Sequence, residues 1–301
     1  MTAALGTEIP RAGERHRRPL AIAFVMVLGF MGVEIATAFA TGSLVILSDA
    51  GHMAGDALGL GMALAAITAA SRTDAEGHHT FGLYRLEILA ALANAVLLLG
   101  VAVYVLFEAA TRFSNPPEIA STPLLVVGGI GLLVNIVAWR LLRRGAAESL
   151  NVEGAMLEVL ADLFGSIGVI VAGALQRFTG WDGADPFFAA AIGLFILPRA
   201  YRLGRQALRV LVQAAPDRLD LAALRRELSA IPGVTDVHDL HVWTLTSEMD
   251  VASAHLVTAP GTPPHPVLDA ARAVIQGEHG VAHATLQVEP DDHHGCEEVA
   301  W

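Results

Sequence analysis

Apolar residues fill the first two thirds of the chain in long runs that short turn-forming segments separate. A helix needs about 20 apolar residues to cross a bilayer. Six runs come close to or exceed this length, and they cover residues 20–40, 44–70, 86–107, 124–142, 152–175 and 187–203. Segments such as Thr41-Gly42-Ser43 have the composition of turns. The pattern predicts an α-helical membrane protein with six transmembrane helices.

From about residue 213 the pattern changes to shorter elements. Residues 217–230 have the period of an amphipathic helix, 234–246 and 251–258 are typical of strands, 268–276 is helical again, and 284–289 is a last strand. Within the first strand, Val237, Asp239, His241 and Trp243 alternate with other residues and are expected to share one face. The order α-β-β-α-β predicts a small α+β domain of the ferredoxin or metallochaperone type, with its helices on one sheet face.

Composition and charge support this division. The chain is 54% hydrophobic and 16% charged, whereas soluble domains carry about 25% charged residues. Residues 213–301 hold 14 acidic residues and four Arg, and this acidic balance argues against a nucleic-acid partner, which requires basic patches. The single cysteine, Cys296, excludes an internal disulfide framework.

Arginine placement predicts the orientation, because Lys and Arg gather on the cytoplasmic side of membrane proteins. Arg residues cluster before the first run, between the second and third, between the fourth and fifth, and at the end of the sixth. We therefore expect a multi-pass protein of the inner cell membrane with both termini cytoplasmic. The expected parts are an N-terminal tail (1–19), a membrane domain (20–212), a cytoplasmic metal-binding domain (213–290) and a mobile polar tail containing His and Cys (291–301).

Two polar pairs interrupt the second and fifth runs: His52 with Asp56, and Glu158 with Asp162. A spacing of four places both members of a pair on one helix face. Ionisable groups inside a membrane are costly and mark ion or substrate paths. One imidazole and three carboxylates form a ligand set that zinc accepts with tetrahedral geometry. The pairs predict a site for a divalent metal cation within the membrane.

Five motifs resemble those of the cation diffusion facilitator family, in its bacterial zinc, cobalt and cadmium efflux branch. They lie in order between about residues 20 and 290 and occupy residues 42–56, 81–91, 151–162, 181–186 and 238–243. The resemblance implies a homodimer of six-helix subunits that export metal by alternating access in exchange for protons. It also places His52, Asp56 and Asp162 at the transport site. Zinc is the first expected substrate, with cadmium and cobalt as further ones.

Glu158 departs from the family pattern, which usually has His at that position. A hard carboxylate oxygen replaces a nitrogen ligand, and this change makes manganese or iron the alternative substrate. Proton exchange also follows from ligand chemistry, since metal ligands must lose their protons to bind. Three clustered carboxylates in a low-dielectric site tend to hold protons when metal is absent.

Further candidate ligands lie outside the membrane runs. Glu76, His78 and His79 in the second loop form either an auxiliary metal site or a solvated polar loop. In the cytoplasmic domain, His238, His255 and Glu289 match family positions for a zinc ion, while a further family His is Gln287 here. That change suggests one metal rather than two, or a replacement ligand from His241, His283 or the tail with Cys296.

Two other functions compete with a proton-coupled exporter. An intramembrane metal-dependent hydrolase would use the quartet to activate water, although a catalytic zinc normally has three protein ligands and an open position. A membrane-anchored metal sensor would use the cytoplasmic domain as its active part. We expect no enzyme activity; the expected partners are divalent cations, protons, membrane lipid and a second copy of the chain.

Overall fold

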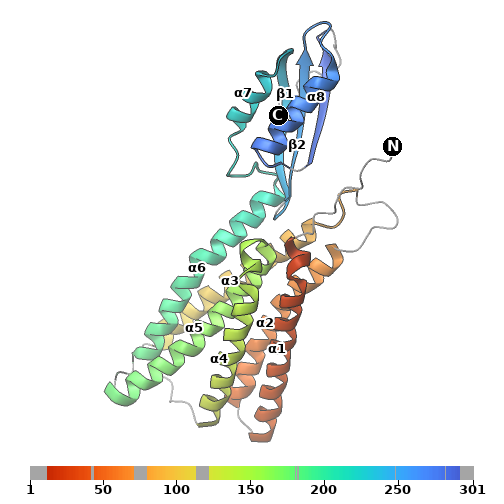
Figure 1. The fold of residues 1–301 in the computed structure, drawn as a ribbon. Helices are drawn as coiled ribbons and strands as arrows, with labels where there is room; N and C mark the ends of the chain where they lie inside the picture. Colours follow the sequence, from red (N-terminus) through yellow and green to blue (C-terminus); the bar gives the residue numbers. More distant parts are fainter. Residues whose placement is uncertain are drawn as a thin grey trace. The chain divides into compact units, whose positions relative to one another are not determined.

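The computed structural model describes residues 12–41, 44–70, 80–112, 122–179, 181, 183–247, 249–281 and 283–291. The chain divides into two compact units, Met1–Leu208 and Arg209–Trp301. The first unit is built from long helices (Figure 1), which are α1 (Ala12–Thr41), α2 (Leu44–Ala70), α3 (Arg85–Arg112), α4 (Thr122–Leu142), α5 (Leu150–Thr179) and α6 (Ala184–Leu211), with a short 3-10 turn η1 (Gly145–Ala147) before α5. These helices match the runs that the hydropathy pattern predicted.

Three of the described helical stretches are long and apolar enough to cross a membrane: Arg15–Thr37, Arg85–Thr111 and Pro186–Leu211. Met53–Ala69 on α2 and Gly129–Leu142 on α4 are shorter apolar stretches, so six crossings stay a prediction. Large apolar side chains also lie on the outer surface, where Tyr104 and Phe107 of α3 are 63% and 67% exposed. Such a surface suits contact with lipid better than contact with water.

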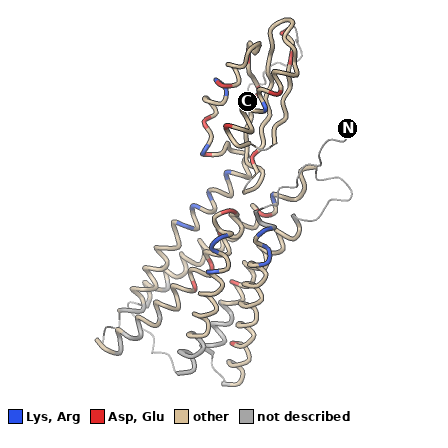
Figure 2. Tube along the Cα trace, viewed as in Figure 1, with Lys and Arg blue, Asp and Glu red and all other residues tan. Residues whose placement is uncertain are grey.

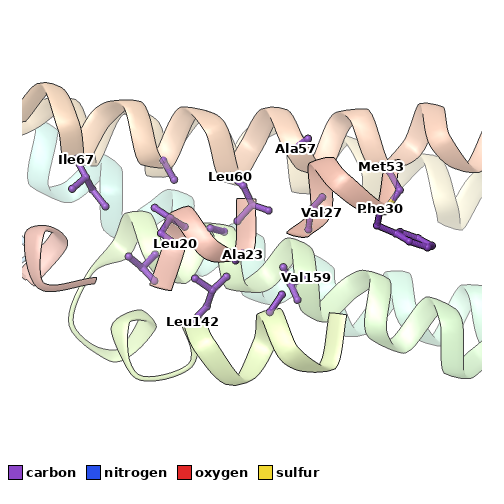
Figure 3. Packing of buried hydrophobic residues seen from close by; sticks show 14 residues of the cluster. Leu20, Ala23, Val27, Phe30, Met53, Ala57, Leu60, Ile67, Leu142 and Val159 are labelled. Carbon is purple, nitrogen blue, oxygen red and sulfur yellow. The ribbon is translucent and has the colours of Figure 1, made fainter. Parts of the chain in front are cut away.

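The interior of the helical unit is a cluster of small and branched apolar side chains from α1, α2, α4 and α5 (Figure 3). On α1, the buried positions Leu20, Ala23, Val27 and Phe30 recur every three or four residues and so form one face. Ala57, Leu60 and Ala63 supply the facing side of α2. The small residues allow the helix backbones to approach closely, which brings the polar residues of α2 and α5 within reach of each other.

One end of the helical unit is rich in arginine. We define this Arg-rich end by the start of α1, with Arg15, Arg17 and Arg18, and by the end of α4 and the turn after it, with Arg140, Arg143 and Arg144 (Figure 2). The His16 ring hydrogen-bonds Glu148 at 2.7 Å, and Arg15 lies 3.4 Å from the same carboxylate. The His16 hydrogen bond lowers the pKa of Glu148, and the charges of His16 and Arg15 act in the same direction. A charged carboxylate thus ties α1 to the α4–α5 connection.

The second unit has the predicted α-β-β-α-β order. It contains α7 (Leu221–Ser229), β1 (Val234–Thr246), β2 (Met249–Thr258), α8 (Pro264–Ala273), a π-helical turn η2 (Val274–Glu278) and β3 (His283–Pro290). The sheet order is β1-β2-β3, with β1 antiparallel and β3 parallel to β2. Side chains of α7 and α8 join those of the strands in one core, so both helices cover the same face of the sheet. The predicted α+β domain is confirmed.

A β-bulge in β1 changes which residues share a face. His238 pairs with His255, but the next pair joins His241 to Ser253, so β1 has one extra residue there. Asp239 adopts a left-handed conformation with φ of 47°, which Asp tolerates better than most residues. Val237 and Val242 therefore both belong to the core. The prediction that Val237, Asp239, His241 and Trp243 share one face is wrong, because the extra residue reverses the alternation.

Candidate functional site

The carboxylates of α2 and α5 lie in the interior of the helical unit. Asp56 is 9% exposed and Glu158 is 6% exposed, while Asp162, one turn further along α5, is partly buried. Glu158 lies directly against Gly59 of α2, where an added Cβ would overlap both carboxylate oxygens. Since Gly59 is three residues after Asp56, the two positions share one face of α2. The structure thus brings Glu158 to the helix face that carries Asp56.

The fourth predicted member of this group is His52. It lies on α2 one turn before Asp56, and its side chain is outside the described residues. The backbone position of His52 is on the same helix face as Asp56, because four residues separate them. Two facing helices, each with two ligand positions, can therefore supply a closed set of oxygen and nitrogen donors to one cation.

Further polar residues lie between this group and the Arg-rich end. Ser149, before α5, donates a hydrogen bond to Glu87 of α3, and Asn151 of α5 donates to the Ala63 carbonyl of α2 at 2.9 Å. Asn94 of α3 lies against Gly154 of α5, where an added Cβ would be 3.0 Å from its Nδ2. The sequence alone predicts no role for Glu87, Asn94 or Asn151. The one sequence feature that could have pointed to Asn94 is its polarity, because it lies within an apolar run, seven positions after Glu87.

The second unit gathers a His and carboxylate cluster on the sheet face opposite its helices. The Glu289 carboxylate of β3 lies between two rings: Oε1 is 2.8 Å from Nδ1 of His255, and Oε2 is 3.6 Å from Nε2 of His238. The two ring centroids are 5.2 Å apart. His238 and Glu289 are only 9% and 3% exposed. Adjacent strands thus bring together three residues that are distant in sequence.

Asp239 joins this cluster because of the bulge. Ligand atoms of His238, Asp239 and His255 all lie within 4.8 Å of one another. An Asp that continued the regular alternation would lie on the core face instead. The sequence alone does not point to Asp239 as a ligand. Gln287, at the position of the absent family His, donates a hydrogen bond to Glu289 at 2.8 Å and so orients its carboxylate.

The other candidate ligands lie at the edge of this cluster, away from it, or outside the described residues. His241 is half exposed, and its Nε2 is 4.0 Å from Asp239. His283 pairs with Val251 in the sheet, four residues along β2 from His255. That separation is about 13 Å along a strand, so His283 is not part of the cluster. Glu76, His78, His79 and Cys296 lie outside the described residues.

The cluster fits a zinc ion by its donor chemistry. Zinc takes His nitrogen and carboxylate oxygen at about 2.0–2.2 Å in a tetrahedral shell, so its ligand atoms lie about 3.3 Å apart. The spacings of 2.8 and 3.6 Å around Glu289 bracket this value. Nε2 of His238, which is buried, has no hydrogen-bond partner among the described residues. A metal ion would satisfy it.

Comparisons with known proteins agree with both units. Residues 20–212 match the cation efflux transmembrane domain, and residues 216–291 match the cytoplasmic domain of cation efflux proteins. The chain belongs to the cation efflux family. It is therefore a membrane transporter of metal cations and not an enzyme, and the hydrolase alternative is wrong.

Three curated relatives are similar over most of their length. The metal cation efflux system protein CzcD of Cupriavidus metallidurans is 42% identical over 92% of this chain and 90% of its own. The zinc transporter ZitB of Escherichia coli is 37% identical over 94% of this chain and 90% of its own length. The cadmium, cobalt and zinc/H(+)-K(+) antiporter of Bacillus subtilis is 36% identical over 92% of this chain and 90% of its own length. Among solved structures, the metal-bound C-terminal domain of the CzcD transporter from C. metallidurans is 33% identical in sequence. The match covers 24% of this chain and 99% of the solved domain, with a TM-score of 0.23.

Proposed function

We propose that the chain exports zinc from the cytoplasm in exchange for protons, with cadmium and cobalt as further substrates, and that His52, Asp56, Glu158 and Asp162 hold the ion. The observation that carries this proposal is the Glu158 carboxylate lying on Gly59, on the face of α2 that holds Asp56. The names of the relatives, which include zinc transporters and an antiporter of cadmium, cobalt and zinc, support the choice of metals.

The exchange follows from the chemistry of the ligands. Buried carboxylates close to one another favour protonation when no cation is present. Binding of the metal from the cytoplasm requires deprotonated ligands and so releases protons. On the opposite side, protonation of the same carboxylates weakens the ligand set and releases the metal. The two substrates compete for one site, and this competition couples their fluxes in opposite directions.

The orientation and the assembly belong to the same proposal. The Arg-rich end faces the cytoplasm, in agreement with the preference of Arg for that side. The N-terminal tail and the second unit then lie in the cytoplasm, and lipid surrounds the apolar helices in the inner membrane. We further propose a homodimer, which the match to the cytoplasmic domain of cation efflux proteins supports.

The metal preference is tested at Glu158. Transport of Zn²⁺, Cd²⁺, Co²⁺ and Mn²⁺ by purified protein in liposomes should give a different ranking for Glu158→His than for the wild type. Imidazole suits zinc, whereas carboxylate also suits manganese, so the variant should lose Mn²⁺ transport relative to Zn²⁺ by about tenfold or more. An unchanged ranking would show that Glu158 does not set the preference.

The cluster of His238, Asp239, His255 and Glu289 is proposed to bind one zinc ion per chain as a structural or regulatory site. Glu289→Ala in the full-length protein should lower the zinc bound at equilibrium by about one ion per chain, because the residue contacts both rings. The matched control is Glu227→Ala, which removes a carboxylate paired with His279 in the same unit. Equal zinc binding by both variants and the wild type would refute this site.

A further inference from the structure

Asn94 is a buried amide whose position the fold alone does not explain. Its residue is 2% exposed, and neither its Oδ1 nor its Nδ2 has a hydrogen-bond partner among the described residues. A buried amide without a partner costs free energy, and most buried polar groups in proteins are satisfied. Its neighbours on the same face of α3 include Ala95 and Leu98, which belong to an apolar cluster with α5 and α6. An alanine or leucine would suit these surroundings better.

Asn94 lies between the depths of two carboxylates, Glu87 and Glu158. The contacts Glu87–Ser149 and Asn94–Gly154 show that α3 and α5 run in the same direction from the Arg-rich end. At about 1.5 Å rise per residue, Asn94 lies about 10 Å deeper than Glu87, and Glu158 follows about 6 Å beyond Gly154. Glu87, Asn94 and Glu158 therefore follow one another in depth along α5, level with Ser149, Gly154 and position 158.

Gly154 makes this arrangement possible. With no side chain at position 154, the amide of Asn94 reaches the α5 backbone, one turn before Glu158. The remaining neighbour that an added Cβ would meet there is the Leu203 side chain, which offers no polar contact. The amide oxygen has no hydrogen-bond partner among the described residues, so its lone pairs are left for a ligand.

We propose that Asn94 is a passage site, meaning a weak, transient binding site for the transported cation on its way to Glu158. This inference rests on the proposed transport site at Glu158. The amide oxygen binds the partly dehydrated ion between Glu87 and Glu158, and releases it because a neutral donor holds a divalent cation less firmly than a carboxylate does. Weak intermediate binding is what rapid passage of an ion requires. Asn94 would thereby set the rate of loading and not the equilibrium affinity.

The test compares transport with equilibrium binding in Asn94→Leu. Zinc uptake into liposomes should slow by about tenfold or more, while the zinc affinity and stoichiometry of the purified protein stay at wild-type values. The melting temperature should not fall, because Leu removes an unsatisfied buried amide. The matched control is Asn135→Leu on α4, another buried Asn, at 4% exposure, which should transport within twofold of the wild type.

Several results would overturn the proposal: uptake by Asn94→Leu within twofold of the wild type, an equal loss in Asn135→Leu, or a loss of binding that matches the loss of transport. If Asn94→Leu does not fold, Asn94→Ser and Asn94→Ala replace it. Ser retains an oxygen donor and should transport faster than Ala, and equal rates would reject the passage site. Glu158→Ala in the same binding assay tests the transport site separately, so failure of one proposal is distinguishable from failure of the other.

Discussion

Replacing Asp56 by alanine is expected to reduce zinc transport by more than about 100-fold while the protein still folds. Asp56 is 9% exposed and shares its helix face with Gly59, on which the Glu158 carboxylate lies. Loss of a residue that only orients a metal ligand typically costs about 10–100-fold in metal affinity or activity, so loss of a ligand itself should cost more. Zinc uptake by reconstituted protein measures the effect.

A suitable control for Asp56→Ala is Asp269→Ala, since the Asp269 side chain is 65% exposed on α8. It should transport at the wild-type rate. The elution profile on size exclusion and the melting temperature of Asp56→Ala establish that the fold is retained. Zinc flux through Asp56→Ala equal to that of the control would reject the transport site as proposed.

Gly59→Ala is expected to lower zinc transport by about ten- to a hundredfold, although the substitution adds only one methyl group. The new Cβ would overlap the carboxylate oxygens of Glu158. Because these atoms form the end of a flexible side chain, the carboxylate moves aside and the helices keep their packing. Displacement of groups that orient or hold a metal typically costs this much in affinity or activity. Uptake and equilibrium zinc binding should fall together.

The chain offers a matched control one turn away on α2. An added Cβ at Gly55 has no atom within 4 Å, so Gly55→Ala introduces the same methyl group into open space. We expect it to transport at the wild-type rate, with a slightly higher melting temperature because Ala favours helix over Gly. Equal transport by the Gly55 and Gly59 variants would show that the position of the Glu158 carboxylate does not matter.

The sequence alone predicts the helices and strands whose hydrophobic periodicity is unambiguous. The long apolar runs predicted the helices of the first unit, and the predicted strand 234–246 coincides with β1 (Val234–Thr246). The sequence also pointed to His238, His255 and Glu289, which the structure brings together across three strands. These predictions share a basis, since each depends on local pattern or on motifs that resemble a family.

The failures depend on contacts that no local pattern encodes. The bulge at Asp239 shifts one strand by a residue, and only the pairing of His238 with His255 and of His241 with Ser253 reveals it. Asn94 is one polar residue in an apolar run, and only the structure shows that it lies against Gly154 on a different helix. Gly59 is a small residue in an apolar run, and its contact with Glu158 is visible only in the three-dimensional structure.

The contact between Gly59 and Glu158 also bears on how this transporter can change during evolution. Because Gly59 has no side chain, α2 puts no side chain of its own at the point where the end of residue 158 lies. A different donor at 158 then needs no compensating substitution on α2. A single codon change at this position can therefore alter the chemical hardness of the ligand set in one step, and a population exposed to a new metal has a short mutational route to a new specificity.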